Sequence, residues 1–316
     1  MAGRNAVILM NLGGPGKVEE IEPFLFNLFC DPDIFHIPVG QKLFAGIISK
    51  LRSGKVAKQY DSIGGGSPIA ELTEKQRVAL AEELKDYDVD VYTAMRYWHP
   101  LTKNIAAEVE KGNYEKIILL PLYPHYSIVT VGSSVNEWFR HYKGKKEKVK
   151  IVKSYFDNPE YHHAVSAKID ETILKFPRNE RESLFILFSA HSTPQSVINK
   201  GDPYQKEIIA SVDSIMKLRG NSNCYGISYQ SKVGPVKWLK PSTEDFIKKL
   251  GEEGIKSLLV VPISFVSDHL ETLFELGIEY RNTALQSGIK NYEVMNALND
   301  SPQFIEALKN IVVKEL

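Results

Sequence analysis

Six short apolar runs alternate with helical patterns along the chain, and this alternation constrains the fold more than any other feature. The runs read NAVILMNL, DVDVYTAM, KIILLPLY, SLFILF, CYGISY and SLLVVPISF. Strands that are each followed by a helix form parallel sheets, because the helix carries the chain back across a face of the sheet. The sequence therefore predicts an α/β protein whose parallel sheets are flanked by helices.

The two halves of the chain resemble distant copies of one another. The first contains RYWHPLTKNIAAEVEKGNYEKIILLPLY, and the second contains VKWLKPSTEDFIKKLGEEGIKSLLVVPISF. Pro121 lies 21 residues after Pro100, and Pro262 lies 21 residues after Pro241. In both halves a Trp precedes the first Pro, a Thr follows two residues later, and a helical stretch leads into a strand. A unit repeated once indicates two similar domains and not a solenoid.

The length and composition of the chain fit two domains of ordinary size. It has 316 residues, of which 43% are hydrophobic, and this is enough to give both domains a core. The polar region around 143–182 contains KGKKEKVK and FPRNERES, which are typical of a surface. We therefore expect an N-terminal domain at 1–150 and a C-terminal domain at 151–316.

Charge and cysteine content exclude several classes of protein. Lys and Arg together number 39, as do Asp and Glu, so the chain lacks the excess positive charge that dominates nucleic-acid affinity. Cys30 and Cys224 are the two cysteines, and they provide neither a disulfide framework nor the spacing of a zinc or iron–sulfur site. No apolar stretch has the length of a signal peptide or a membrane span. The sequence predicts a cytoplasmic protein that does not bind nucleic acid.

The segment 24–51 departs from the alternating pattern because it is crowded with apolar residues. Its predicted helix has basic residues on both borders of an apolar face, which is formed by Leu43, Phe44, Ile47, Ile48 and Leu51. One interpretation is a helix docked on the N-terminal domain. The other is a lid over an apolar ligand that also contacts the surface of the inner membrane, as basic amphipathic helices do. The periodicity does not distinguish between them, so both stay open.

Two glycine-rich loops match nucleotide-binding loops only in part. NLGGP follows the first strand but lacks the third glycine of GxGxxG. YDSIGGGSPIAEL has no Lys-Ser/Thr after its glycines and no strand before them, so it is not a P-loop. Its simpler interpretation is a turn with Ser67 as the N-cap and Pro68 as the first helical residue. Such a helix start can also bind the carboxylate of a ligand.

Arg52 and Arg96 are candidates for binding ligand carboxylates, because a guanidinium binds a carboxylate through two parallel hydrogen bonds. Taken alone, each is more typical of a surface arginine. Whether they bind a ligand together depends on whether they line the same cleft.

A histidine and a row of carboxylates stand beyond two of the predicted strands. His191 follows RESLFILF, and its small neighbours leave room for a ligand to approach the ring. The other strand, KSLLVVPI, is followed by His269, Glu271, Glu275 and Glu279. The ends of adjacent parallel strands meet at one crevice, so the two segments can face each other across a ligand.

Each of these features also has a structural interpretation. A lone histidine most often holds a turn, and Asp268 with Glu271 has the spacing of a capping box at a helix start. The capping box leaves Glu275 and Glu279 unexplained, because they continue at i+4 intervals, where like charges repel. An acidic row of this kind suits a path for metal ions or protons.

The motifs taken together resemble the ferrochelatases, which insert ferrous iron into a porphyrin. They occur in the order of that family and cover nearly the whole chain: NLGGP, QYDSIGGGSPI, RYWHPLT, PLYPHYS, GSSVNEW, LFSAHSTPQSVINKGDPY, YQSKVGPVKWLKPST and SDHLETLFELGIEY. So many long motifs in order are more specific than any one of them.

The resemblance implies two Rossmann-like domains that enclose a porphyrin cleft, and a lyase that inserts Fe²⁺ as a substrate and releases two protons. It implies that His191 and Glu271 form the pair that binds the metal and transfers protons. The acidic route away from this pair corresponds to Asp268, His269, Glu275 and Glu279. The positions that correspond to porphyrin contacts are Leu12, Arg52, Tyr60, Ser67, Arg96, Tyr97, Tyr123, Ser231 and Trp238.

Two departures from relatives narrow the expected chemistry. Some members of the family bind an iron–sulfur cluster through cysteines, most of them in a C-terminal extension that does not follow Leu316 here, and Ile128 stands where those relatives have a further cluster cysteine. We therefore expect no cluster. The branch that uses coproporphyrin typically has a YGTP-like loop in place of NLGGP, which favours protoporphyrin IX as the substrate and protohaem as the product.

Two alternatives remain open at this stage. One is a chelatase for a related macrocycle, either coproporphyrin III or sirohydrochlorin. The other is a non-catalytic carrier of porphyrin or haem, although a carrier needs a cleft and has no use for the acidic row.

Overall fold

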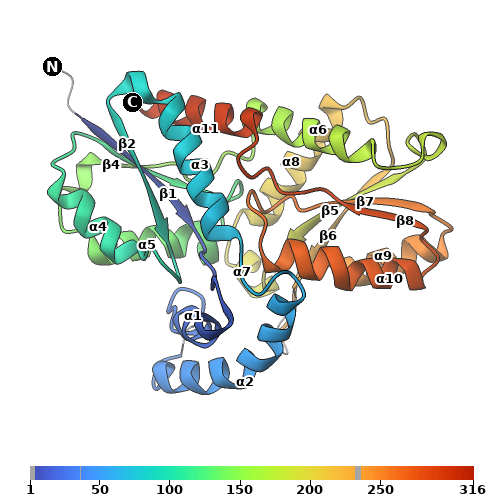
Figure 1. Cartoon of the computed structure of the whole chain (residues 1–316), viewed down its shortest axis with the longest axis horizontal. Coiled ribbons are helices and arrows are strands. Elements are labelled where there is room, and N and C mark those ends of the chain that lie inside the picture. The colour runs from blue at the N-terminus through green and yellow to red at the C-terminus, as the bar shows by residue number, and fades with distance from the viewer. Residues whose placement is uncertain (1–3, 36, 232–235) are drawn as a thin grey trace. The chain divides into compact units, whose positions relative to one another are not determined.

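The computed structural model describes residues 4–35, 37–231 and 236–316, which fold into two compact units (Figure 1). Unit 1 comprises Met1–Ser154 and Phe304–Leu316, and unit 2 comprises Tyr155–Gln303. Each unit contains one four-stranded sheet in which every pairing is parallel. The predicted α/β class with two similar units is confirmed.

The sheet of unit 1 has the strand order β2-β1-β3-β4, so the first strand lies inside the sheet. Its central strands are buried on both faces, as the continuous apolar runs predict. Helices α4 and α5 cover one face through a cluster that includes Trp138, and α3 packs against β1 and β2. The strands are β1 (Asn5–Asn11), β2 (Val89–Met95), β3 (Ile117–Pro121) and β4 (Val149–Ile151). The helices are α1 (Ile21–Phe29), α2 (Gln41–Asp61), α3 (Ile69–Glu83), α4 (Thr102–Lys111), α5 (Ser133–His141) and α11 (Pro302–Glu315).

The sheet of unit 2 has the strand order β6-β5-β7-β8, which repeats the order of the first sheet. Helices α9 and α10 cover one face through a buried cluster that includes Leu250 and Ala284. The strands are β5 (Phe185–His191), β6 (Tyr225–Gln230), β7 (Ser257–Val261) and β8 (Asn291–Val294). The helices are α6 (Pro159–Ile173), α7 (Gln195–Asn199), α8 (Tyr204–Leu218), α9 (Thr243–Glu252) and α10 (Tyr280–Gln286).

The internal repeat extends to single hydrogen bonds. The backbone N–H of Met95 donates to the carbonyl of Pro100 over 2.7 Å, and Tyr229 donates to Pro241 over 2.9 Å at the equivalent place. In both units the next helix begins two residues after that proline. The repeated sequence pattern therefore specifies the same strand-to-helix connection twice.

The C-terminal helix differs from the predicted division of the chain. The sequence places 151–316 in one domain, but α11 packs with unit 1, and the boundary falls after Ser154. Lys116 Nζ donates to the carbonyl of Glu315 over 2.6 Å, and Lys309 pairs with Glu83 over 2.8 Å. These contacts are between residues far apart in sequence, which is why the sequence pattern does not reveal them.

The apolar segment of unit 1 forms α1 and α2, which pack against each other. Only part of its predicted apolar face is covered. Leu43, Ile47 and Leu51 are 72%, 52% and 73% exposed, whereas Phe44 and Ile48 are half-buried. Among the residues that the structure describes, no helix combines the length and the apolar character needed to cross a membrane.

Candidate active site

Polar side chains gather in unit 2 where the parallel strands reach their carboxyl ends. β5 ends at His191, β6 ends at Gln230, and Ser264 follows β7. The backbone N–H of His191 donates to Ser264 Oγ over 2.8 Å, and the Tyr204 hydroxyl donates to the carbonyl of His191 over 2.9 Å. The site is thus built at the edge of the sheet where open α/β proteins bind ligands.

His191 and Glu271 form the central pair of this site. His191 Nδ1 lies 3.0 Å from Glu271 Oε2, and the two side chains keep exposed fractions of 36% and 29%. Because Glu271 faces Nδ1, the other ring nitrogen of His191 is the one available to a ligand. A carboxylate at Nδ1 fixes the tautomer of the neutral ring and stabilises the charged ring.

A second histidine lies on the other side of the same carboxylate. His269 is 5% exposed, and its Nε2 is 3.5 Å from Glu271 Oε2. Its Nδ1 lies 3.0 Å from the carbonyl of Ser267, which can only accept, so we assign the proton to Nδ1. The ring of Phe265 meets both imidazoles edge-on, 5.9 Å from that of His191 and 4.4 Å from that of His269. Packing therefore fixes the orientation of both rings.

The pair perturbs both pKa values in opposite directions. Burial lowers the pKa of His191, but the charge and hydrogen bond of Glu271, with a further contribution from Glu275, raise it above its usual value. Burial raises the pKa of Glu271, but His191 and His269 outweigh burial and hold that pKa well below its usual range. His191 is thereby a stronger base than an ordinary histidine.

Glu271 begins a π-helical segment, η6 (Glu271–Glu279), that runs into α10. π-helical turns are rare and often occur at functional sites. Glu271 and Glu275 both point toward the strand ends, and Leu276 of the same segment is fully buried in the core of unit 2. The segment presents carboxylates on one side while its apolar side anchors it.

Glu275 is held by four hydrogen-bond donors. The N–H and hydroxyl of Ser231 donate to its two oxygens, the former over 2.9 Å, and the Tyr280 hydroxyl donates over 2.7 Å. The amide of Gln230 is 3.4 Å away. Burial and the charge of Glu271 nevertheless raise the pKa of Glu275. Ser231 has a φ of 66°, a left-handed conformation that costs free energy in a residue other than glycine and that aims both of its donors at Glu275.

Asp268 and Glu279 do not join this group. The Asp268 carboxylate accepts from the Thr272 hydroxyl over 2.9 Å, and from Asn299 Nδ2 over 2.7 Å. The predicted capping box is therefore not formed, because Asp268 fastens a loop and Glu271 faces His191.

The loop 296–303 lines a cavity of about 400 Å³ together with α6, and neither His191 nor Glu271 borders that cavity. The side chain of Glu279 is exposed at the end of η6.

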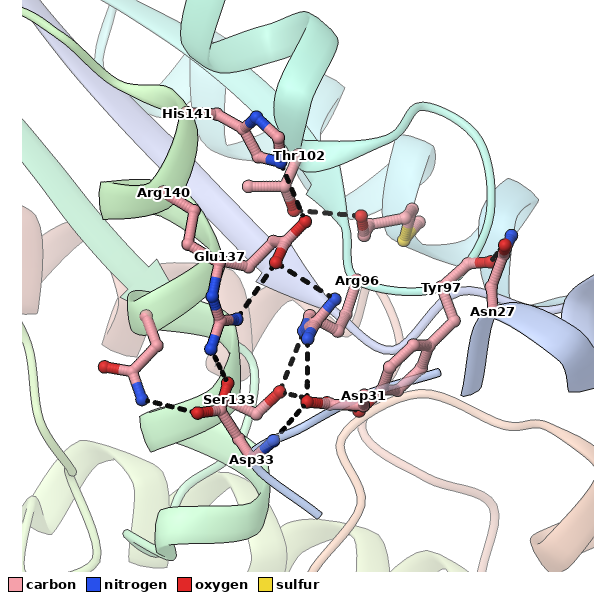
Figure 2. Close-up of polar contacts among 12 residues, drawn as sticks. Asn27, Asp31, Asp33, Arg96, Tyr97, Thr102, Ser133, Glu137, Arg140 and His141 are labelled. Atoms are coloured by element: carbon pink, nitrogen blue, oxygen red, sulfur yellow. Dashed lines mark hydrogen bonds and ion pairs between the residues drawn. The ribbon is translucent and has the colours of Figure 1, made fainter. Parts of the chain in front are cut away.

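Arg96 and Tyr97 belong to a buried polar cluster in unit 1 (Figure 2). Arg96 pairs with Asp31 over 2.9 Å, and the two side chains are 7% and 0% exposed. Its Nε donates to Ser133 Oγ over 2.8 Å, and the Tyr97 hydroxyl donates to Asp31 as well. Glu137 lies on the other side of the guanidinium (Figure 2), and its Oε2 is 3.5 Å from Arg96 Nη1. The sequence offered no partner for Arg96, and Asp31 is the partner that sequence reasoning missed.

Replacing Arg96 with methionine should destabilise the protein strongly. It would leave the fully buried carboxylate of Asp31 without its counter-ion, and breaking a buried pair in this way costs about 3–5 kcal/mol. The free energy of unfolding in urea measures the effect. Arg140→Met is the control, because Arg140 is partly exposed and its ion pairs are worth below about 1 kcal/mol. Equal losses of unfolding free energy in the two variants would contradict the assignment of Arg96 and Asp31 as a buried ion pair.

Comparison with known proteins identifies the family. The family model described as Ferrochelatase matches residues 4–316. The chain belongs to the ferrochelatase family. The ferrochelatase of a Picosynechococcus species is 46% identical, covering 99% of this chain and 83% of its own length. The ferrochelatase of Gloeobacter violaceus is 43% identical, covering 98% of this chain and 97% of its own length. The chain is thus a metal-insertion enzyme, a lyase of haem and porphyrin synthesis.

Solved structures support the fold of the ferrochelatase family. SirB from Bacillus subtilis with Fe³⁺ aligns with a TM-score of 0.54 at 12% identity, over 98% of this chain and 95% of its own. The sirohydrochlorin chelatase SirB from Bacillus subtilis subspecies spizizenii, in complex with cobalt, gives 0.52 at 12% identity over 98% and 94%. At this identity the likeness concerns the fold alone.

The structure places the remaining predicted porphyrin contacts of unit 1 in different surroundings. Arg52 is half-buried with its guanidinium 5.7 Å from the centre of the Phe29 ring, and Tyr60 is 3% exposed. Leu12 is half-buried after β1. Ser67 is 9% exposed, and its Oγ accepts from the N–H of Ile69 over 3.4 Å. Helix α3 begins at Ile69, one residue later than predicted.

Tyr123 and Trp238 are both half-buried. Burial raises the pKa of the Tyr123 phenol. Trp238 forms a bridge with Pro194, just beyond β5, and its indole N–H finds no hydrogen-bond partner among residues 4–35, 37–231 and 236–316. Part of the family motif YQSKVGPVKWLKPST, residues 232–235, lies outside the described residues.

The described residues hold no group of three or more His, Cys, Asp and Glu side chains arranged around a metal ion. In this family ferrous iron is the substrate. The site also contains residues that sequence reasoning missed, namely Gln230, Ser264, Phe265 and Tyr280. The positions of Gln230 at the end of β6 and of Ser264 three residues after β7 could have revealed them.

Proposed function

We propose that this protein inserts Fe²⁺ into protoporphyrin IX to give protohaem, and that His191 and Glu271 carry the reaction. The observation that supports these roles is the 3.0 Å contact between His191 Nδ1 and Glu271 Oε2 at the carboxyl end of β5. It provides a base and a carboxylate side by side, which the reaction needs because two pyrrole protons must leave as the metal enters.

The raised pKa of His191 suits it to accept a pyrrole proton. In the neutral ring, Nδ1–H donates to Glu271 and Nε2 is left to accept. Once Nε2 takes a proton, Glu271 stabilises the imidazolium that forms. The same imidazole and carboxylate are ligands that a divalent iron accepts, and a site with few ligands can pass the ion on to the macrocycle.

Protons and metal ions are proposed to move along the carboxylates of η6. Glu275 follows Glu271 in the row, and its raised pKa allows it to hold a proton on the way to the exposed Glu279. His269 Nε2, which carries no proton when Nδ1 does, lies 3.5 Å from Glu271 Oε2 and is proposed to accept a proton that passes along the row. Asp268 is proposed to act on this route through the segment that it anchors.

The porphyrin itself is proposed to meet the predicted contact residues. Arg52 and Ser67 are suited to the propionates, since a guanidinium and a helix start both bind carboxylates. Tyr123 and Trp238 provide flat, partly exposed rings for the macrocycle. Arg96 and Tyr97 are proposed to support the contact residues of unit 1 rather than to bind the propionates, because their polar groups are engaged with Asp31.

The test is anaerobic incubation with ferrous iron and protoporphyrin IX, followed by the visible spectrum, with coproporphyrin III and sirohydrochlorin in parallel. Insertion fastest with protoporphyrin IX would support the proposal. Faster insertion into another macrocycle would name that substrate instead. A spectral shift on binding without any insertion would indicate a carrier.

We propose that no iron–sulfur cluster is bound. The chain has two cysteines, Cys30 in unit 1 and Cys224 in unit 2, whereas a cluster usually takes four cysteine ligands. Analysis of iron and acid-labile sulfide in protein purified without oxygen tests this, and stoichiometric sulfide would contradict it.

We propose that α2 rests on the surface of the inner membrane. Leu43, Ile47 and Leu51 stand exposed at four-residue intervals, and Lys42 and Lys50 beside them are exposed as well. An apolar stripe flanked by lysines binds a surface that is apolar inside and anionic outside. We expect the protein to bind vesicles that contain anionic lipid.

Changing Leu43 and Leu51 to glutamine should weaken vesicle binding by about tenfold for each leucine, because each loses its transfer into the bilayer. Co-sedimentation with vesicles measures the effect. Leu174→Gln is the matched control, since Leu174 is 65% exposed in unit 2. Unchanged binding of the double variant would rule out this surface.

A further inference from the structure

A chain of buried hydroxyl groups leads from the core of unit 2 to η6. Ser228 Oγ lies 3.0 Å from Thr243 Oγ1, which lies 2.9 Å from Ser189 Oγ, which donates to Gln230 Oε1 over 2.7 Å. All four side chains are 0% exposed. Buried polar groups are costly unless each is hydrogen-bonded, and here every member of the chain has a partner.

The direction of every bond in this chain is determined. Gln230 Nε2 lies 3.5 Å from the carbonyl of Glu271, and a carbonyl can only accept, so the atom facing it is the amide nitrogen. The Gln230 oxygen therefore faces Ser189. A hydroxyl has one hydrogen, so Ser189 must accept from Thr243, and Thr243 from Ser228. The donors all point toward η6.

Gln230 contacts η6 at two points. Its amide reaches the Glu271 carbonyl and, over 3.4 Å, Glu275 Oε2. These two points are one turn apart, on the side of η6 that carries the carboxylates. Ser231, the next residue, adds two further donors to Glu275. The end of β6 is thus hydrogen-bonded to η6 at the turn that contains both carboxylates.

We infer that Gln230, oriented by Ser189 and Thr243, is a positioning residue for metal insertion. It sets the register of η6 so that Glu271 meets His191 and Glu275 lies next in the row. The inference rests on the proposed function, in which these side chains carry the reaction. It gives a role to the four buried, hydrogen-bonded side chains of this network.

Gln230→Glu replaces the amide donor with an oxygen and keeps the acceptor for Ser189. We expect kcat for iron insertion to fall by about tenfold or more, because small misplacements of reacting groups are costly, while KM for porphyrin changes little. Amide hydrogen exchange should be faster in residues 271–279. Ser189→Ala, which places no charge in the core, should reproduce a smaller part of both effects.

Ser211→Ala is the matched control. Ser211 is a fully buried serine of α8 whose hydroxyl bonds to the Phe156 carbonyl, away from the network. It should lower the melting temperature but leave kcat and the exchange of η6 unchanged. Wild-type kcat and exchange in Ser189→Ala, or equal effects in Ser211→Ala, would overturn the inference. If the wild type inserts no iron but the variants still show faster exchange in residues 271–279, the proposed function is refuted, whereas the role of Gln230 in positioning η6 stands.

Discussion

Replacement of His191 with alanine is expected to abolish iron insertion while leaving porphyrin binding measurable. The ring at the end of β5 is the proposed proton acceptor, and positioned bases contribute about 100- to 10,000-fold to a rate. Porphyrin binding should persist because the proposed propionate contacts lie on other residues. Single-turnover spectra give the insertion rate, and porphyrin fluorescence quenching gives the affinity.

His163→Ala is the control for this variant, because His163 is an exposed histidine of α6 in the same unit. It should insert iron at the wild-type rate. Near-normal turnover of His191→Ala would contradict the assignment of His191 as the proton acceptor. Loss of porphyrin binding together with turnover would indicate that the ring serves the ligand and not the proton.

The long apolar strands were predictable from the sequence, whereas the short edge strands were not. Six apolar runs correspond to β1, β2, β3, β5, β6 and β7. β4 has three residues and a polar centre, Lys150, and β8 has the sequence NYEV, so neither carries an apolar run. β2 and β6 also lie at sheet edges but have seven and six residues, so it is the shortness of β4 and β8 that leaves too few positions for an apolar pattern.

The site was predictable where a residue's role follows from its place beyond a strand. His191 and Glu271 were expected to face each other across a ligand, and the structure brings them to the same sheet edge but into direct contact, 3.0 Å apart. The partner of Arg96 was not predictable, since Asp31 reaches it from a different element, just after α1. A sequence shows which side chains leave a strand, but long-range packing decides which charges they meet.

The role of Asp268 illustrates the same limit. Its spacing to Glu271 suggested a capping box, and the resemblance suggested a proton route. The structure shows bonds to Thr272 and Asn299 in place of the capping box, and the proton route stays a proposal. The reason is the π-helical start of η6, which directs Glu271 to His191 and leaves Asp268 to face the loop after β8. Local spacing predicts an α-helical cap and has no means of anticipating a π-helix.

Replacement of Glu271 with glutamine is expected to lower turnover strongly and to move the acid limb of the kcat/KM profile to lower pH. Burial lowers the pKa of His191, and Glu271 is the main group that opposes this effect. Without its charge, the pKa of His191 should fall, so the neutral, proton-accepting ring persists at lower pH. Turnover should drop by about 100-fold or more, because the imidazolium formed in the reaction loses its counter-charge.

The stability of the same variant provides an independent check of the pair. A raised histidine pKa stabilises the fold below the pKa of the unfolded chain, and this contribution disappears as pH rises through the folded pKa. The lowered pKa of Glu271 contributes above its unfolded value, and that contribution is lost only in strong acid. The wild type should therefore exceed Glu271→Gln in stability most clearly at mildly acidic pH, with the difference shrinking as His191 loses its proton. If neither the acid limb nor the stability at mildly acidic pH differs between the wild type and Glu271→Gln, His191 does not titrate against Glu271.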